Sequence, residues 1–203
     1  MSNSEYSRRE LLRHIGASIT LAAAGGQMLS AQDVQHVHSA VAAEVHYTPK
    51  ALNAHEFATL QRLADLIVPA DEHSPGALEA KAADFIDFLC AATDDMKRIY
   101  TGGLAWLDDE MEKRYDGKDF VSATPARQKE MLDLIAFREN RAKDPSIVPG
   151  IQFFSWARNM VVDAYYTSRI GTFQELEYKG NSAMSHFSVP REAIDYALKR
   201  SPF

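Results

Sequence analysis

Residues 53–71 read Asn-Ala-His-Glu-Phe-Ala-Thr-Leu-Gln-Arg-Leu-Ala-Asp-Leu-Ile-Val-Pro-Ala-Asp, and this stretch decides the fold class. Asn53 followed by Glu56 fits a helix N-cap in which the two residues bond reciprocally. The apolar residues that follow recur at helical spacing: Phe57, Leu60, Leu63, Ala64 and Ile67. Pro69 cannot continue a helix. We therefore predict a helix that begins after Asn53 and ends before Pro69.

The remainder of the chain repeats this helical pattern. A second helix follows Ala77, a third begins at Asp94 and ends near Tyr115, a fourth is opened by Thr124-Pro125, a long fifth runs from about Ile151, and Pro190 opens a short last one. No run alternates with period two, as a half-buried strand would. The sequence predicts an all-α fold, an irregular bundle of about five to six helices with an N-terminal export leader and an irregular C-terminal tail.

An export address precedes this body. Residues 7–13 read Ser-Arg-Arg-Glu-Leu-Leu-Arg, and a weakly apolar run from Ile15 to Ala24 follows. The stretch resembles the twin-arginine (Tat) signal, whose slots are filled here by Ser7, Arg8, Arg9, Leu11, Leu12 and Arg13. Ser7 and Glu10 would also fit the capping box of an amphipathic helix, but a charged, then apolar, then small-residue order favours export. The Tat route carries proteins that are already folded.

We divide the chain accordingly into three segments. Residues 1–31 are expected to be the signal peptide, with a weak cleavage pattern at Leu29-Ser30-Ala31 and a second candidate at Val41-Ala42-Ala43 that would extend the signal to residue 43. An uncleaved leader remains open. Residues 32–51 are expected to be a linker or extended arm in which His36 and His38 are solvated. Residues 52–203 form the helical domain.

Size and charge limit the function. The chain has 203 residues and a net charge of −6, which fits one compact domain plus the leader. Three arginines against two glutamates give the leader +1, so the rest carries −7. An acidic body has no basic stripe for nucleic acid and no attraction to an anionic membrane surface. After the leader, no apolar run approaches the length of a membrane span.

Few residues suggest chemistry. Asp71, Glu72 and His73 form a compact acid–base group on a loop, which would suit a general base or metal ligand, or simply turn and cap bonds with solvated side chains. Tyr165, Tyr166 and Trp156 would suit a cofactor wall or, more commonly, a core or interface. Cys90, the single cysteine, is either a buried thiol or a bridge to another subunit. No catalytic, metal or cofactor-binding motif is recognisable, which favours a partner over a catalyst.

Three stretches together resemble one family. They are the helix and loop from Phe57 to Asp71, Ser74-Pro75-Gly76-Ala77 with Phe85-Ile86-Asp87, and the tail Gly171-Thr172-Phe173-Gln174-Glu175-Leu176-Glu177-Tyr178-Lys179-Gly180-Asn181. The chain resembles the gluconate 2-dehydrogenase subunit 3 family over roughly Leu52 to Asn181, and a Tat-like leader is typical of that family.

The resemblance implies a small noncatalytic subunit of a periplasmic, membrane-associated dehydrogenase complex. In such complexes the large subunit is a flavoprotein that carries FAD and oxidises a sugar, sugar acid or polyol. A multihaem cytochrome c often passes electrons on, so haem c, or an iron–sulfur cluster, would belong to partner subunits and no cofactor to this chain. The small subunit's leader would take the flavoprotein through the Tat translocon. Free-standing enzyme and small-ligand module remain the alternatives.

If the chain is such a subunit, turns and aromatic side chains should contact the partner. We expect the loop from Pro69 to Ala77, the arm that contains His36, and the tail from Tyr165 to Asn181 to do so. The residues expected at the interface are Pro69, Asp71, Pro75, Gly76, Tyr165, Tyr166, Phe173, Tyr178 and Gly180.

Overall fold

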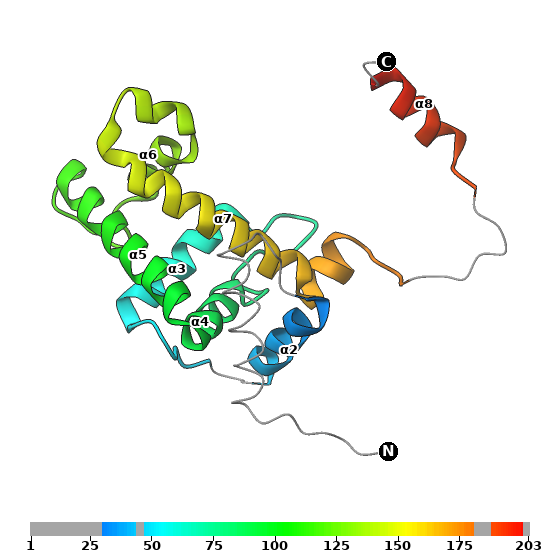
Figure 1. Ribbon diagram of the computed structural model, residues 1–203, viewed down its shortest axis with the longest axis horizontal. Helices are drawn as coiled ribbons and strands as arrows, with labels where there is room; N and C mark the ends of the chain where they lie inside the picture. The colour runs from blue at the N-terminus through cyan, green and yellow to red at the C-terminus, as the bar shows by residue number, and fades with distance from the viewer. Residues whose placement is uncertain (1–29, 44–46, 181–187, 201–203) are drawn as a thin grey trace.

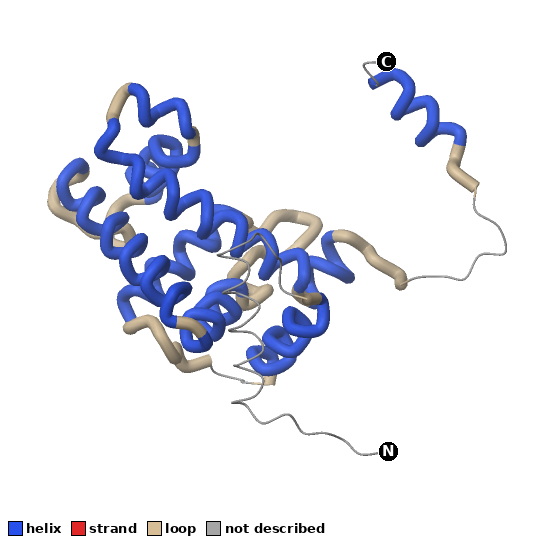
Figure 2. Tube along the Cα trace, in the orientation of Figure 1, coloured by secondary structure: helices blue, strands red, loops and turns tan. Residues whose placement is uncertain are grey.

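The computed structural model of the chain describes residues 30–43, 47–180 and 188–200. Within these ranges every regular element is a helix (Figure 2), so the all-α prediction is confirmed. The α-helices are α2 (Ala31–Ala42), α3 (Ala54–Ile67), α4 (Ala82–Ala92), α5 (Asp94–Arg114), α6 (Pro125–Ala136), α7 (Val148–Thr167) and α8 (Arg191–Arg200). The short elements are the 3-10 helices η1 (Arg138–Ala142) and η2 (Pro145–Ile147) and the π-helical turn η3 (Gly171–Glu175). The predicted export motif at residues 7–13 lies outside the described residues.

Two helix starts follow the local sequence closely. Asn53 Oδ1 accepts from the backbone N–H of Glu56 at 2.9 Å, and Glu56 Oε2 accepts from the N–H of Asn53 at 2.8 Å. Thr124 caps α6, with Pro125 in its first turn. Each cap involves residues within a single turn, which is why both predictions are confirmed.

The prediction of a linker or extended arm over residues 32–51 is wrong for its first half, because residues 31–42 form the helix α2. Ser30 and Asp33 make a reciprocal capping box at its start. Val37 and Val41, one turn apart, are 0% and 2% exposed, and α2 packs against α4. Histidines flank Val37 and only alanines flank Val41, so the apolar stripe was too short to reveal a helix. This additional helix raises the number above the five or six expected.

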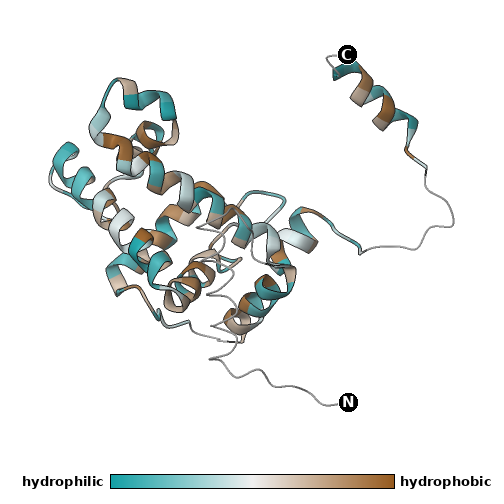
Figure 3. Ribbon diagram, viewed as in Figure 1, coloured by the Kyte–Doolittle hydropathy of each residue, from teal (hydrophilic) through white to brown (hydrophobic). Residues whose placement is uncertain are grey.

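The core is organised around α7. This helix contacts α3, α4, α5 and α6 as it crosses the body (Figure 1). Every residue of α4 from Ala82 to Cys90 is buried, and Figure 3 shows apolar stretches gathered in α4 and in the middle of α7. Helix α8 lies apart from the body in Figure 1 and buries none of its residues.

Helices α5 and α7 meet at Gly103. Glycine is a poor helix former, but α5 continues unbroken from Asp94 to Arg114. A Cβ at position 103 would lie 2.0 Å from a ring carbon of Phe153. The glycine therefore allows the aromatic ring of α7 to lie directly on the backbone of α5, where a side chain would separate the two helices.

A buried carboxylate fixes the chain ahead of α3. Asp87, on α4, is fully buried. Its Oδ2 accepts from the Tyr47 hydroxyl at 2.8 Å and from the backbone N–H of Lys50 at 2.6 Å. Its Oδ1 accepts from the N–H groups of Ala51 and Leu52 at 3.1 and 2.8 Å. A buried charge is tolerable only when hydrogen bonds replace its hydration, and here four donors do so.

We predict that Asp87→Ala lowers the free energy of unfolding by about 3–5 kcal/mol, because three backbone N–H groups and a phenol lose their acceptor. Asp87→Asn keeps one carbonyl oxygen and should cost less, about 1–3 kcal/mol. Urea unfolding followed by circular dichroism measures both. Asp109→Ala, at an exposed position of α5, is the control and should stay within about 0.5 kcal/mol. Equal stability of Asp87→Ala and the parent chain would contradict this role.

Candidate partner-binding surface

The loop from Pro69 to Ala77 is folded tightly on itself. The N–H of Ala77 donates to the carbonyl of Val68 at 2.9 Å, and the N–H of Asp71 to that of Ser74 at 3.1 Å. Asp71 Oδ1 accepts from the N–H groups of His73 and Ser74 at 2.8 and 2.9 Å. These two backbone donors hold the pKa of the Asp71 carboxyl below its usual value. Asp71 thus shapes the turn.

Tyr165 ties this loop to α7. Its hydroxyl donates to the carbonyl of Pro75 at 2.9 Å and lies 2.7 Å from Ser74 Oγ. The loop also needs glycine at position 76, where a Cβ would lie 2.5 Å from the backbone nitrogen of Ala70. Tyr165 is only 2% exposed. Its assignment as a partner anchor does not fit this burial, and the same holds for buried Gly76.

The first five loop residues, Pro69 to His73, lie at the surface. Pro69 and Asp71 are exposed and remain interface candidates, while Pro75 is half-buried. Glu72 and His73 are 86% and 80% exposed and lie 3.4 Å apart. Among the described residues, no group of three or more His, Cys, Asp or Glu could hold a metal ion. The geometry favours the turn-forming interpretation of Asp71, Glu72 and His73 over a catalytic one.

Beyond Tyr165, apolar side chains turn outward. Tyr166, Phe173, Leu176 and Tyr178 are 38%, 57%, 58% and 45% exposed, and we call these four residues the apolar tail. Gly180 follows with a φ of +85°, a backbone conformation that favours glycine. Large apolar residues exposed together are typical of a protein–protein contact. Leu176 lies in the tail expected to contact the partner, although it was not named among the individual interface residues.

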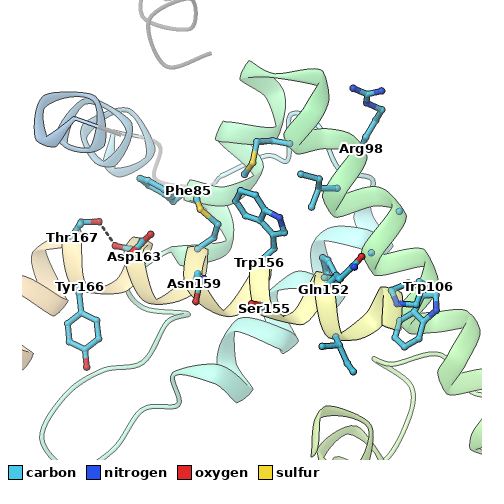
Figure 4. Close-up of a pocket in the computed structure, with 18 of the residues that line it drawn as sticks. Phe85, Arg98, Trp106, Gln152, Ser155, Trp156, Asn159, Asp163, Tyr166 and Thr167 are labelled. Carbon is cyan, nitrogen blue, oxygen red and sulfur yellow. Dashed lines mark hydrogen bonds between the residues drawn. The ribbon is translucent and has the colours of Figure 1, made fainter. Parts of the chain in front are cut away.

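A groove between α5, α7 and the start of α2 has a volume of about 1330 Å³. Figure 4 shows Trp156 and Asn159 on α7, Trp106 on α5 and Phe85 on α4 around it. Trp106 and Trp156 are the only tryptophans of the chain. Arg138 and Arg141, on η1, line the groove without an ion pair among the described residues. Sequence reasoning missed this groove because its walls come from elements far apart in the chain.

His38 is not the solvated histidine that we expected. Its Nε2 lies 2.8 Å from Thr167 Oγ1 at the end of α7, and its ring centre is 4.7 Å from that of Phe85. Burial lowers the pKa of His38 to about 4, so the imidazole is neutral at pH 7. This contact joins α2 to α7. His36 is exposed, as expected.

Cys90 faces the interior of the body. Its side chain is 2% exposed, and burial raises the pKa of the thiol. A buried, protonated thiol is unreactive. These observations favour packing as a small apolar residue over a bridge to another subunit.

The comparisons with known proteins identify the family. The model for gluconate 2-dehydrogenase subunit 3 matches residues 54–182. The chain belongs to the gluconate 2-dehydrogenase subunit 3 family. The match runs from the first residue of α3 to just beyond the apolar tail, so it covers both the loop and the groove-forming helices α5 and α7. Neither a search of curated proteins nor one of solved structures found a match. In the described part of this family member, no helix is long and apolar enough to cross a membrane.

We predict that Tyr165→Phe releases the loop from α7. Loss of the hydroxyl leaves the Pro75 carbonyl without this donor and should cost about 1–2 kcal/mol. Amide hydrogen exchange at Ala77 should accelerate, because the loop opens without global unfolding. Tyr166→Phe, a neighbouring and more exposed position, is the control. If both variants exchange at the parent rate, the hydroxyl does not hold the loop.

Proposed function

We propose that this chain is the noncatalytic small subunit of a periplasmic FAD-dependent dehydrogenase complex that oxidises a sugar, sugar acid or polyol. The family match over residues 54–182 carries the proposal, because membership implies the small subunit of such a dehydrogenase complex. FAD would belong to the large subunit, and haem c or an iron–sulfur cluster to an electron-transferring subunit. The complex, through those partners, would associate with the membrane.

The exposed apolar surfaces suit a subunit. The apolar tail and the groove present aromatic side chains to solvent, and aromatic residues dominate the energetics of protein interfaces. Arg138 and Arg141 would suit acidic side chains on the partner. Residues of the Pro69–Ala77 loop that remain exposed, Pro69 and Asp71, extend this surface. We therefore place the flavoprotein contact along the groove, the apolar tail and the outer side of the loop.

The leader adds a second role. A Tat-type signal on this chain, if the large subunit lacks one, would let a complex that has folded around FAD in the cytoplasm leave as one unit. The small subunit would thus stabilise the flavoprotein and escort it through the Tat translocon. An escort needs an interface with the flavoprotein that stays intact during transport. The apolar tail and the groove would form such an interface.

The groove also gives the alternative of a ligand-binding module some support, since its volume of about 1330 Å³ exceeds that of a typical small-ligand pocket. A module of this kind would retain a small molecule when the chain is purified alone. Mass spectrometry of the isolated chain under native conditions separates this alternative from the subunit role.

We predict that the chain co-purifies with the flavoprotein subunit of its complex. Phe173→Ser with Leu176→Ser should raise the dissociation constant of that complex about tenfold, because two apolar contacts are lost. Leu78→Ser with Val121→Ser, at positions of comparable or smaller exposure outside the apolar tail, is the control. Calorimetry on purified subunits gives the constants. Unchanged affinity would remove the tail from the interface, and absence of any complex would contradict the subunit role.

We predict that Arg8→Lys with Arg9→Lys abolishes export of both the chain and its flavoprotein partner, because the arginine pair is lost. The positive charge is kept, so a loss of export cannot come from a change in charge. Dehydrogenase activity in the periplasmic fraction measures the effect. Lys179→Arg, which changes a basic residue of the tail, is the control and should leave export unchanged. Parental periplasmic activity of the Arg8/Arg9 variant would show that this leader does not carry the partner.

A further inference from the structure

The structure bears on a question that the sequence leaves open, namely where an export leader would be removed. Small residues at Val41-Ala42-Ala43 form one candidate site and Leu29-Ser30-Ala31 another. A signal peptidase acts on an accessible, extended segment. The conformation and burial of residues 30–43 therefore decide which candidate is available in a folded chain.

Helix α2 contains the first candidate and is an integral part of the core. Val41, at the position that the peptidase must read, is 2% exposed, and Val37 is fully buried. The carbonyl of Val41 accepts from Lys81 Nζ at 3.3 Å. One turn earlier, His38 lies against Phe85 and hydrogen-bonds to Thr167. Cutting after Ala43 would require α2 to leave α4 and α7.

Whether α2 can leave α4 and α7 depends on whether the chain folds before or after cleavage. Because Tat substrates fold before transport, the peptidase would meet α2 already packed on the body; this step rests on the export route given under the proposed function. Helix α2 also contributes Ala31, Val34 and Gln35 to the wall of the groove. Its removal would expose Phe85 and leave the groove open on one side.

We propose that α2 stays in the exported protein as its first structural element and as one wall of the groove, and that the peptidase does not cut after Ala43. Removal of the leader at the other candidate, after Ala31, would then leave Gln32 at the new N-terminus. In the full chain, the capping box between Ser30 and Asp33 marks the start of α2. The family match begins only at residue 54, so this extends the functional body by one helix beyond it.

The intact mass of the protein recovered from the periplasm tests the cleavage position. We expect a chain that still contains residues 32–43. In addition, Ala43→Arg places a large charged residue where a peptidase needs a small one. This variant should be exported and processed like the parent, since the position is exposed at the end of α2. A mature chain that begins at Glu44, or precursor that accumulates only in Ala43→Arg, would overturn the proposal.

The structural part is tested without export. In the full chain, Val37→Ser with Val41→Ser should lower the melting temperature by roughly 10–15 °C, because two buried side chains are lost. Gln32→Ser with His36→Ser, the same spacing on the exposed face of α2, should change it by less than about 2 °C. Equal shifts in the two variants would show that α2 is not part of the core. Failure of export itself appears as cytoplasmic precursor and contradicts the proposed route, whereas an exported chain that begins at Glu44 contradicts only this inference.

Discussion

The hydrogen bonds accepted by the Asp87 carboxylate are the constraint on which the arrangement of helices depends. Asp87 takes three backbone N–H groups of residues 50–52, directly ahead of the first helix of the family domain. This fixes where α3 begins relative to α4. The direction of α3 in turn determines where the loop from Pro69 to Ala77 begins. The Tyr165 hydroxyl connects this loop to α7 by a hydrogen bond to the Pro75 carbonyl. Two sets of polar contacts thus hold α3, α4 and α7 together around an apolar core.

Several of the residues by which the family is recognised have contacts inside the chain. Asp87 satisfies the backbone before α3, Gly76 leaves room for the backbone of Ala70, and Ser74 lies against the Tyr165 hydroxyl. A motif whose residues have such internal contacts identifies the fold. Through the family, it also indicates the kind of complex to which the chain belongs. It does not indicate a substrate, because these contacts all lie within the chain.

The sequence predicts features that depend on residues close together along the chain, and it misses those that depend on residues far apart along the chain. The caps at Asn53 and Thr124 involve neighbours within one turn, and both helices begin where predicted. Helix α2 was missed because its burial rests on two valines that meet α4, forty residues or so further along the chain. Tyr165 and Tyr166 are adjacent and chemically identical, yet only the structure shows that one is internal and the other exposed.

The distribution of polar and apolar groups also explains why a subunit is a better description than an independent enzyme. Asp87, Ser74 and Tyr165 form hydrogen bonds within the fold, whereas Trp156 of the groove and the apolar tail are exposed. Apolar surface of this kind is stabilised when a partner covers it and favours non-specific association when none does. On the proposed Tat route, a chain that folds before export would gain from meeting its partner in the cytoplasm. The exposed surface and the proposed leader would then serve one requirement, namely assembly before transport.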